Sequence, residues 1–376
     1  MMYFIKRAAL LSVALFLGMV AYSIYAMAEQ PTLSKIGPAL HHPWGMDFLN
    51  DDAILVTERR GNLFRINLAN GNTHQIGNMP DVYHKRQGGL LDVLVDGEWI
   101  YLCYSAVLNG GSSTAIDRAR LDTQSRNLIN RTTIFTANRP THSGHHFGCR
   151  MAISQTGQQA GYLFASLGDR GDRNNAQDPA VHAGSMIRIH PDGRIPTDNP
   201  KFANWLPEIW SIGHRNPQGM AIHPDTGDIW THEHGPRGGD EINRITGEPY
   251  AGGTNYGWPT VSHGREYATG RQVSKHKSRA GYADPKWVWD PSIAPSGMAF
   301  YPQDASMFAD MRGQLLVGSL KFRQLWLVRL SDGTPRDEQV VMDRAIGRVR
   351  DVAIAPDGSI LLLNDEASGG VWRISR

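Results

Sequence analysis

The sequence predicts an all-β protein, a six-bladed β-propeller with four-stranded antiparallel blades, on three observations. One phrase occurs six times: a small residue, Met or Leu, a small or acidic residue, an apolar stretch, a polar turn and a second apolar stretch. Successive copies begin about 45 to 80 residues apart, and helical periodicity is almost absent. Four strands at such a repeat length are typical of a propeller blade, so six copies predict six blades.

Each phrase is expected to form two short strands joined by a turn, with Asp-Gly or Asn-Asp pairs at the turns. The phrases occupy residues 43–59, 87–105, 149–169, 217–236, 295–320 and 349–366. Further strands are expected in the apolar segments 61–68, 185–195 and 324–333. A two-sheet sandwich would also contain many short strands, but it would not repeat one phrase six times.

The first 28 residues have the order of a signal peptide. Lys6 and Arg7 precede an apolar run that ends at Ala26-Met27-Ala28, a small-residue cleavage pattern. A retained membrane anchor is the alternative, because about 20 apolar residues can span a bilayer. We expect residues 29–376 to form one propeller domain that is periplasmic or secreted, with no membrane span after cleavage.

Charge argues against a nucleic-acid partner. Without residues 1–28, which hold two of the 38 basic residues and no acidic ones, 36 basic and 36 acidic residues remain. A net charge of zero provides no electrostatic footprint for a phosphate backbone. An oxidising compartment would permit a disulfide between Cys103 and Cys149, but their spacing cannot establish it.

Four basic side chains stand at distinctive positions: Arg215 in GHRNPQG, Lys321 in GSLKFRQ, and Arg348 and Arg350 in GRVRDV. Arg348 and Arg350 alternate across a strand start, so both can point to the same side. If all four face the mouth of the central channel, they form a site for carboxylates. The alternative is that each is a solvated charge at a strand end.

Two loops contain acidic residues that could bind a cation. In EHGPRGGDEIN, the carbonyls of Gly235 and Pro236 precede Asp240 and Glu241, a pattern that suits calcium but is also common in simple turns. In GDRGDRNN, a turn is the preferred interpretation of Asp169 and Asp172, because the interleaved arginines would oppose a cation.

Three histidines lie in HSGHHFGCRM, namely His142, His145 and His146. Adjacent residues of a strand face opposite ways, so at most one of His145 and His146 is expected to enter the channel. If the strand continues back from Arg150, His146 shares its face with Gly148 and Arg150. A single imidazole beside an anion pocket suits a general base, and a structural histidine is the alternative.

Seven motifs in order resemble the soluble pyrroloquinoline-quinone-dependent sugar dehydrogenases, especially the aldose sugar dehydrogenase branch. They are HHFGCRM, IGHRNPQGMA, EHGPRGGDEIN, GGTNYGWP, PSIAPSGMAF, GSLKFRQLW and GRVRDVAIAPDG. The resemblance extends from about Pro43 to Arg376. It implies two cofactors, pyrroloquinoline quinone (PQQ) and Ca²⁺, and oxidation of aldoses at C1 to the lactone, with electrons passed to an external acceptor.

The resemblance also implies roles for individual residues. His146 would be the general base and Gln87 would lie near the sugar. Gly235 and Pro236 would bind calcium through their carbonyls. The cofactor would be bound by Arg215 and Asn216 near its reactive carbonyl, by Lys321, Arg348 and Arg350 at its carboxylates, and by Ser292, where some members have threonine.

Departures from the glucose-specialised branch imply a broader specificity. His145 replaces an aspartate, Arg170 replaces a glutamine, and the segment between Trp258 and Pro295 is short. These differences favour an open pocket for several aldoses in a monomer, and they put a further structural calcium and a dimer contact in doubt. The competing hypotheses are a calcium-dependent lactonase or esterase and a binding propeller without catalysis.

Overall fold

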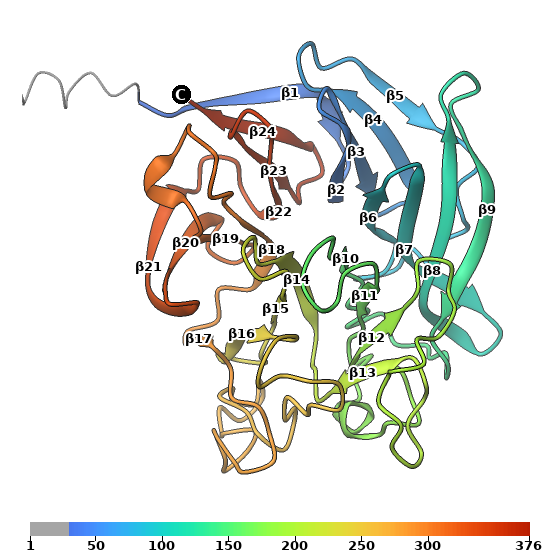
Figure 1. Ribbon diagram of the computed structural model, residues 1–376, viewed down its shortest axis with the longest axis vertical. Coiled ribbons are helices and arrows are strands. Elements are labelled where there is room, and N and C mark those ends of the chain that lie inside the picture. Colours follow the sequence, from blue (N-terminus) through green and yellow to red (C-terminus); the bar gives the residue numbers. More distant parts are fainter. Residues whose placement is uncertain (1–29) are drawn as a thin grey trace, which may run out of the picture.

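The computed structural model describes residues 30–376, which form six four-stranded antiparallel sheets around a central axis (Figure 1). The predicted propeller is confirmed, and each repeated phrase supplies the two innermost strands of one blade. The expected signal peptide lies outside the described residues. The part of the chain that the structure describes contains no α-helix, only two short 3₁₀ helices, η1 (Arg173–Gln177) and η2 (Ala309–Met311).

The first five blades follow chain order from the axis outward. Blade 1 contains β2 (Pro43–Asn50), β3 (Ala53–Glu58), β4 (Asn62–Asn67) and β5 (Thr73–Ile76). Blade 2 contains β6 (Leu90–Asp96), β7 (Trp99–Leu108), β8 (Gly111–Asp122) and β9 (Asn127–Thr136). Blade 3 contains β10 (Met151–Ile153), β11 (Leu163–Ser166), β12 (Ser185–Ile189) and β13 (Ile209–Ile212).

Blades 4 and 5 have the same four-stranded order. Blade 4 consists of β14 (Pro217–Ile222), β15 (Ile229–Glu233), β16 (Asp240–Arg244) and β17 (Trp287–Trp289), so Asp240 and Glu241 begin a strand of the blade and do not lie in a loop. Blade 5 contains β18 (Pro295–Phe300), β19 (Leu315–Ser319), β20 (Gln324–Ser331) and β21 (Thr334–Asp343).

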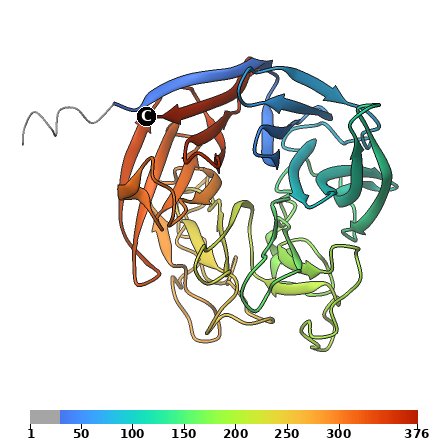
Figure 2. The same cartoon turned by 45° about the horizontal axis from the view of Figure 1, so that its top comes forward.

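Blade 6 closes the ring with both ends of the described chain. It contains β22 (Val349–Ile354), β23 (Ile360–Asn364), β24 (Gly369–Ser375) and, outermost, β1 (Thr32–Leu40). Thr32 pairs with Ser375 and Ile36 with Val371, and the two strands lie side by side in both views (Figures 1 and 2). Backbone hydrogen bonds therefore hold the ring closed.

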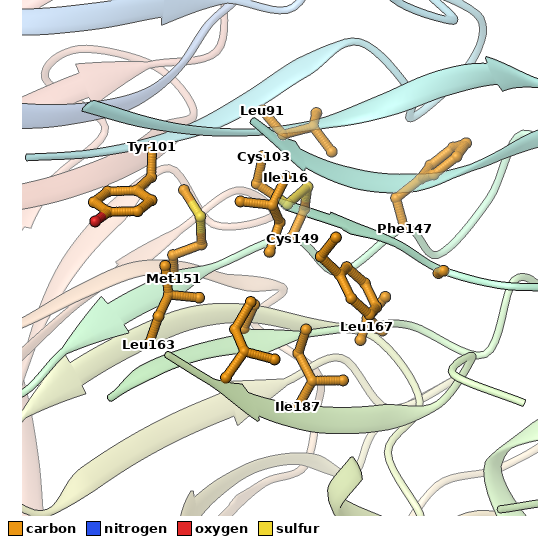
Figure 3. Packing of buried hydrophobic residues seen from close by; sticks show 14 of the residues in the cluster. Leu91, Tyr101, Cys103, Ile116, Phe147, Cys149, Met151, Leu163, Leu167 and Ile187 are labelled. Carbon is orange, nitrogen blue, oxygen red and sulfur yellow. A yellow bond between two sulfur atoms is a disulfide. The ribbon is translucent and has the colours of Figure 1, made fainter. Parts of the chain in front are cut away.

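Apolar side chains fill the space between neighbouring blades. One cluster joins blades 2 and 3 through residues such as Tyr101 and Leu163, and Figure 3 shows a disulfide within it. That disulfide links Cys103 in β7 to Cys149, two residues before β10, and both cysteines are fully buried. The structure thus answers a question that spacing left open and ties two blades together covalently.

The segment before β10 differs from the expected strand. Residues 142–150 are irregular, and His146, Gly148 and Cys149 have φ angles of 51°, 68° and 81°. Left-handed residues rotate successive side chains out of strand alternation. The prediction that His146, Gly148 and Arg150 share one strand face is therefore wrong.

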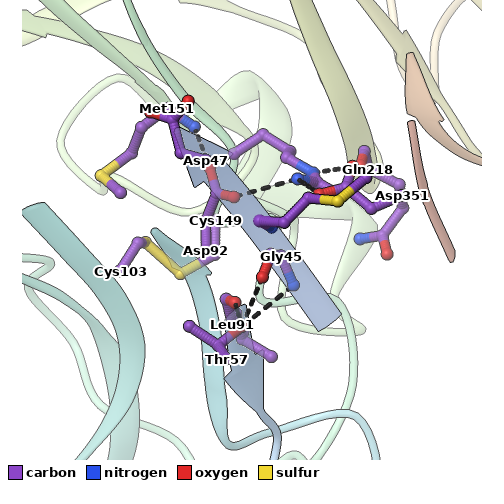
Figure 4. A network of polar contacts seen from close by, with 12 residues as sticks. Gly45, Asp47, Thr57, Leu91, Asp92, Cys103, Cys149, Met151, Gln218 and Asp351 are labelled. Carbon is purple, nitrogen blue, oxygen red and sulfur yellow. Dashed lines mark hydrogen bonds and ion pairs between the residues drawn. A yellow bond between two sulfur atoms is a disulfide. The ribbon is translucent and has the colours of Figure 1, made fainter. Parts of the chain in front are cut away.

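Arg150 instead lies at the axis, where it joins blade 3 to three other blades. Its Nη1 lies 2.9 Å from Asp92 Oδ1 in blade 2 and its Nη2 lies 2.8 Å from Asp351 Oδ1 in blade 6 (Figure 4). Its guanidinium also lies over the Trp44 ring of blade 1, 4.3 Å from the centroid. All three charged residues are buried, so each depends on the others for compensation.

Asp92 and Asp351, two buried carboxylates, share the guanidinium of Arg150, and the pKa of Asp92 is raised in this arrangement. Burial raises the pKa of Asp92 to about 7 despite the charge of Arg150, and the nearby Asp351 carboxylate adds to the increase. A raised pKa means that the folded protein keeps a proton that the unfolded chain releases. The contribution of Asp92 to stability is therefore complete below about pH 4 and is lost as the pH rises to about 7.

We predict that Asp92→Asn flattens the pH dependence of stability. Between pH 4 and 7 the free energy of unfolding of the wild type should fall relative to that of the variant by a few kcal/mol, on the order set by the shift. Urea unfolding of both proteins at several pH values measures the difference in slope. Parallel curves would contradict the titration assigned to Asp92.

Candidate active site

A cavity of about 420 Å³ lies at one rim of the ring, lined by residues from all six blades. Five of the residues singled out in the sequence line it: Gln87, Asn216, Lys321, Arg348 and Arg350. Each lies within or next to an inner strand, so the convergence of the blades brings together residues that are far apart in sequence. Propellers place their sites in this way.

Positive charge dominates this cavity. Its lining contains four basic side chains, Arg59, Lys321, Arg348 and Arg350, but only one carboxylate, Asp365. Arg350 Nη2 lies 3.0 Å from Asp365 Oδ2, and Arg348 Nη2 lies 3.6 Å from the same oxygen. Burial opposes ionisation of Asp365, but Arg350 and His42 outweigh it and hold its pKa far below the usual range. The remaining positive charge favours an anionic ligand.

Arg59 is a cavity residue that the sequence reading missed. It follows β3 in blade 1, and among residues 30–376 no carboxylate forms an ion pair with it. Its neighbour Arg60 is the residue that pairs with Glu58, at 2.7 Å. The signal was present in the sequence, since Arg59 ends the first repeated phrase at the same rim as the other site residues.

Two further cavities adjoin the first. A cavity of about 850 Å³ is lined by Gly235, Pro236 and Ser292, and it shares Lys321, His234 and Ala294 with the first. Arg215 lines a third, much smaller space, together with Gly235 and two acidic residues, Glu233 and Glu241. The structure therefore gathers the predicted cofactor and metal residues in one region, but not in a single pocket.

The carbonyl of Gly235 already has a partner. Arg215 Nη1 donates to it at 2.8 Å and to the carbonyl of His234 at 2.9 Å. A carbonyl has a second lone pair, so Gly235 can still bind a cation beside Pro236. Within the described part of the chain, no group of three or more His, Cys, Asp or Glu is arranged to hold a metal. The oxygen ligands that the loop itself offers to a cation are thus the backbone carbonyls of Gly235 and Pro236.

Asp240 shapes this loop. Its Oδ1 accepts from the Gly235 amide at 2.9 Å, its Oδ2 accepts from the Ala294 amide at 2.8 Å, and the Ser292 hydroxyl also donates to Oδ2. Burial raises the pKa of Asp240 despite these hydrogen bonds. Both oxygens are therefore used to join β16 to the two loops that carry Gly235 and Ser292.

His146 lies next to the first cavity and is oriented by a carboxylate. Its Nδ1 lies 2.6 Å from Asp169 Oδ1, and its backbone amide donates to Gln87 Oε1 at 2.7 Å. The following residues Phe147 and Gly148 line the cavity. His145 is exposed and does not line the cavity, and its ring lies edge-on to that of His146 with 6.3 Å between the centroids.

Asp169 begins a turn, as the sequence indicates, since the Asp172 amide donates to its carbonyl at 3.2 Å, but its side chain has a further role that the sequence does not reveal. Its Oδ2 also accepts from Trp258 Nε1 at 2.9 Å. Burial opposes its ionisation, but the hydrogen bond and charge of His146 outweigh burial and lower the pKa of Asp169. An ionised Asp169 holds the proton of His146 on Nδ1, which leaves Nε2 free to accept another.

Two glycines allow the His146 loop to lie against blade 3. A Cβ on Gly168 would lie 2.4 Å from the carbonyl oxygen of His146, and a Cβ on Gly148 would lie 2.7 Å from the Gly168 amide nitrogen. Real side chains cannot approach so closely. The backbone of Gly168 therefore fixes how near His146 comes to Asp169.

Comparisons with known proteins agree on one family. The family model described as Glucose / Sorbosone dehydrogenase matches residues 40–373. Aldose sugar dehydrogenase YliI of Escherichia coli (strain K12) is 36% identical over 365 residues, covering 94% of this chain and 95% of the relative. Quinoprotein glucose dehydrogenase B of Acinetobacter calcoaceticus is 26% identical, covering 93% of this chain and 89% of the relative.

Solved structures of aldose sugar dehydrogenases have the same fold as this chain. The apo form of the soluble aldose sugar dehydrogenase from Escherichia coli superposes with a TM-score of 0.85 at 34% identity, covering 92% of this chain and 99% of the other. The PQQ-bound aldose sugar dehydrogenase from Streptomyces coelicolor superposes with a TM-score of 0.73 at 25% identity, covering 92% of this chain and 97% of the other.

We predict that Gly168→Ala lowers the free energy of unfolding by about 1 to 3 kcal/mol, the usual cost of forcing an extra carbon into packed structure. Urea unfolding measures it. Gly144→Ala is the matched control in the same loop, because its Cβ would meet only the side chain of the exposed Arg86, at 3.0 Å. Equal losses in the two variants would contradict the close packing assigned to Gly168.

Proposed function

We propose that this chain, which belongs to the glucose/sorbosone dehydrogenase family, oxidises aldose sugars at C1 to the lactone with PQQ and calcium as cofactors. The chain is an oxidoreductase of the sugar dehydrogenase type. One observation carries the finer proposal: a histidine–carboxylate pair, His146 and Asp169, adjoins a cavity lined by four basic side chains and one carboxylate.

The residues that line the three adjoining cavities suit a tricarboxylate quinone. Lys321, Arg348 and Arg350 would bind its carboxylates through charge-assisted hydrogen bonds. Arg215 and Asn216 would lie at its reactive carbonyl, and Ser292 would add a hydroxyl contact. When bound, the quinone would supply a hydride acceptor and the calcium ion a Lewis acid beside it. The carbonyls of Gly235 and Pro236 would hold that ion together with cofactor oxygens.

The protein's own part of the chemistry is a proton transfer. Nε2 of His146 takes the proton of the C1 hydroxyl, which makes departure of the hydride easier. The carboxylate of Asp169, 2.6 Å from Nδ1, stabilises the imidazolium that forms. Gln87 already accepts from the His146 amide through Oε1, so its amide NH₂ group remains to donate to the sugar.

Broader features of the proposal are consistent with the structure. The buried Cys103–Cys149 disulfide suits the oxidising environment of a periplasmic or secreted protein. No helix within residues 30–376 is long and apolar enough to cross a bilayer. We further propose a monomer that accepts several aldoses and passes its electrons to an external acceptor.

A calcium-dependent hydrolase is the alternative class. That chemistry calls for several carboxylate or amide side chains around one ion. Here the loop at Gly235 offers carbonyls, with Arg215 donating to one of them and Lys321 lining the same cavity. This arrangement favours an anionic cofactor over a hydrolytic metal centre.

Reconstitution tests the proposal. The protein without residues 1–28 is stripped of metal, then supplied with calcium and PQQ, and reduction of an artificial electron acceptor is followed with a panel of aldoses. The proposal requires activity that depends on both additions. Lactone hydrolysis that needs calcium but no quinone would instead support the alternative.

We predict that His146→Gln lowers kcat by about 10²- to 10⁴-fold, the usual contribution of a general base. The dissociation constant of PQQ should change by less than about threefold, because in this assignment His146 contacts the sugar and not the carboxylates of the cofactor. Steady-state kinetics and fluorescence titration measure the two effects. Retention of wild-type kcat would contradict the base assignment.

We predict that Lys321→Met and Arg348→Met each weaken PQQ binding about 10- to 100-fold, the range of a lost hydrogen bond to a charged group. Titration of the protein with the cofactor in calcium buffer gives the dissociation constants. Arg344→Met is a suitable control, because Arg344 is exposed and pairs only loosely with Asp343 at 3.8 Å. Equal affinity in all three variants would show that the cavity does not bind the quinone.

A further inference from the structure

The loop that carries His146 is irregular, yet the carbonyl groups around His146 are all occupied. Five consecutive carbonyls, those of residues 143–147, each accept a hydrogen bond from outside the loop. The donors are Arg170 Nη2 at 2.6 Å, Gln87 N at 3.0 Å, Arg170 Nη1, Arg170 N at 3.3 Å and Thr114 Oγ1 at 3.0 Å. A single residue, Arg170, therefore supplies three of the five donors, including the one to the carbonyl of His146 itself.

Arg170 is an unusual residue to find in this place. Its side chain is buried, with 6% of the residue exposed, and among residues 30–376 no carboxylate forms an ion pair with it. Its guanidinium lies over the Phe147 ring, 3.5 Å from the centroid, and Nη2 also lies 3.2 Å from Ser112 Oγ. Burial lowers the pKa of Arg170 to about 10, so it stays charged at neutral pH.

A buried cation without an anion is costly to stability. An apolar side chain of similar length would fill the same space at lower cost, but it could not donate to carbonyls. The compensation that Arg170 receives comes from the loop, since Ser143, His145 and Phe147 contribute two carbonyls and a ring. The loop therefore requires the N–H donors of the Arg170 guanidinium, and the volume of the side chain matters less.

The residue before Arg170 completes the arrangement. Asp169 holds the imidazole of His146 through Nδ1, while Arg170 holds the backbone of the same residue. The downstream end of the loop is fixed by the buried disulfide at Cys149. The loop thus has a covalent anchor on one side of His146 and a hydrogen-bonded anchor on the other.

We propose that the Arg170 side chain positions His146: by binding the carbonyls of Ser143 and His145, its guanidinium fixes the backbone from which the imidazole reaches the substrate, and its backbone N–H adds a bond to the His146 carbonyl. The proposal deepens the proposed function and rests on it for the kinetic prediction only. Arg170 touches neither substrate nor cofactor in this assignment. Its effect passes through the placement of one base, and a misplacement of about 1 Å can cost about 10²-fold in rate.

Arg170→Met tests this, because methionine keeps the length and loses the guanidinium donors to the Ser143 and His145 carbonyls, while the backbone N–H to the His146 carbonyl remains. We expect kcat to fall about 10- to 100-fold, while KM and the dissociation constant of PQQ change by less than about threefold. Arg170→Lys, which restores the charge but not the fork of donors, should recover part of kcat. Arg139→Met is the matched control, since Arg139 also has a left-handed backbone, φ 51° against 59°, but is exposed and pairs with Asp178.

Two readouts do not need turnover. The His146 Nδ1 proton, held by Asp169, should give a low-field proton NMR signal in the wild type and in Arg139→Met that is broadened or lost in Arg170→Met. Hydrogen exchange at the amides of His146 and Cys149 should be faster in Arg170→Met. If the wild type shows no quinone-dependent activity, the proposed function fails, and these readouts still decide whether Arg170 positions His146.

Thr114→Val covers the case in which Arg170→Met does not fold. It removes the donor to Phe147, changes no charge and keeps the side-chain shape, so it should shift the same two readouts in the same direction by a smaller amount. The proposal is overturned if a folded Arg170→Met keeps the low-field signal, the amide exchange rates and the kcat of the wild type. If Arg170→Met does not fold, unchanged readouts in Thr114→Val overturn it.

Discussion

The ion cluster at the axis is the constraint on which the rest of the structure depends. Arg150 is held between Asp92 and Asp351, with Trp44 against its guanidinium, so one buried charge fixes the relative positions of blades 1, 2, 3 and 6. Because a buried charge that loses its partner is strongly destabilising, the inner strands have little freedom to slide. The cluster also reaches the site: Arg150 Nε donates to the carbonyl of Gln218 at 2.9 Å, and Arg350 Nη1 donates to Gln218 Oε1 at 3.2 Å.

The proposed base is placed from the same point. Cys149 directly precedes Arg150, and its disulfide lies in the core between blades 2 and 3. His146 lies only three residues before Cys149. The axis therefore positions the base on one side and the anion-binding side chains on the other. The loop that carries His146 needs no regular structure, because donors from other elements bind the carbonyls of residues 143–147.

Regular features of the fold could be read from the sequence. The six phrases predicted six blades because each contains the apolar pattern of two inner strands, and four basic residues near the starts and ends of those strands were recognised as candidates. Arg348 and Arg350 do line one cavity, as their alternation suggested. Such predictions succeed because strand periodicity places side chains directly.

Other features depend on contacts that no local pattern encodes. The orientation of His146 follows from left-handed residues and from the close approach of Gly168, which strand alternation cannot describe. The sequence indicates only a turn at Asp169, because His146, the partner of its side chain, lies 23 residues away. The bond from Arg215 to the Gly235 carbonyl and the pairing of Cys103 with Cys149 likewise join distant parts of the chain.

A crystal structure of the protein soaked with calcium and PQQ tests the central claim most directly. The account predicts quinone carboxylates on Lys321, Arg348 and Arg350, an ion on the carbonyls of Gly235 and Pro236, and Nε2 of His146 facing the open side of the quinone. Density for the quinone outside this cavity, or an ion bound elsewhere with the Gly235 carbonyl still held by Arg215 alone, would contradict it.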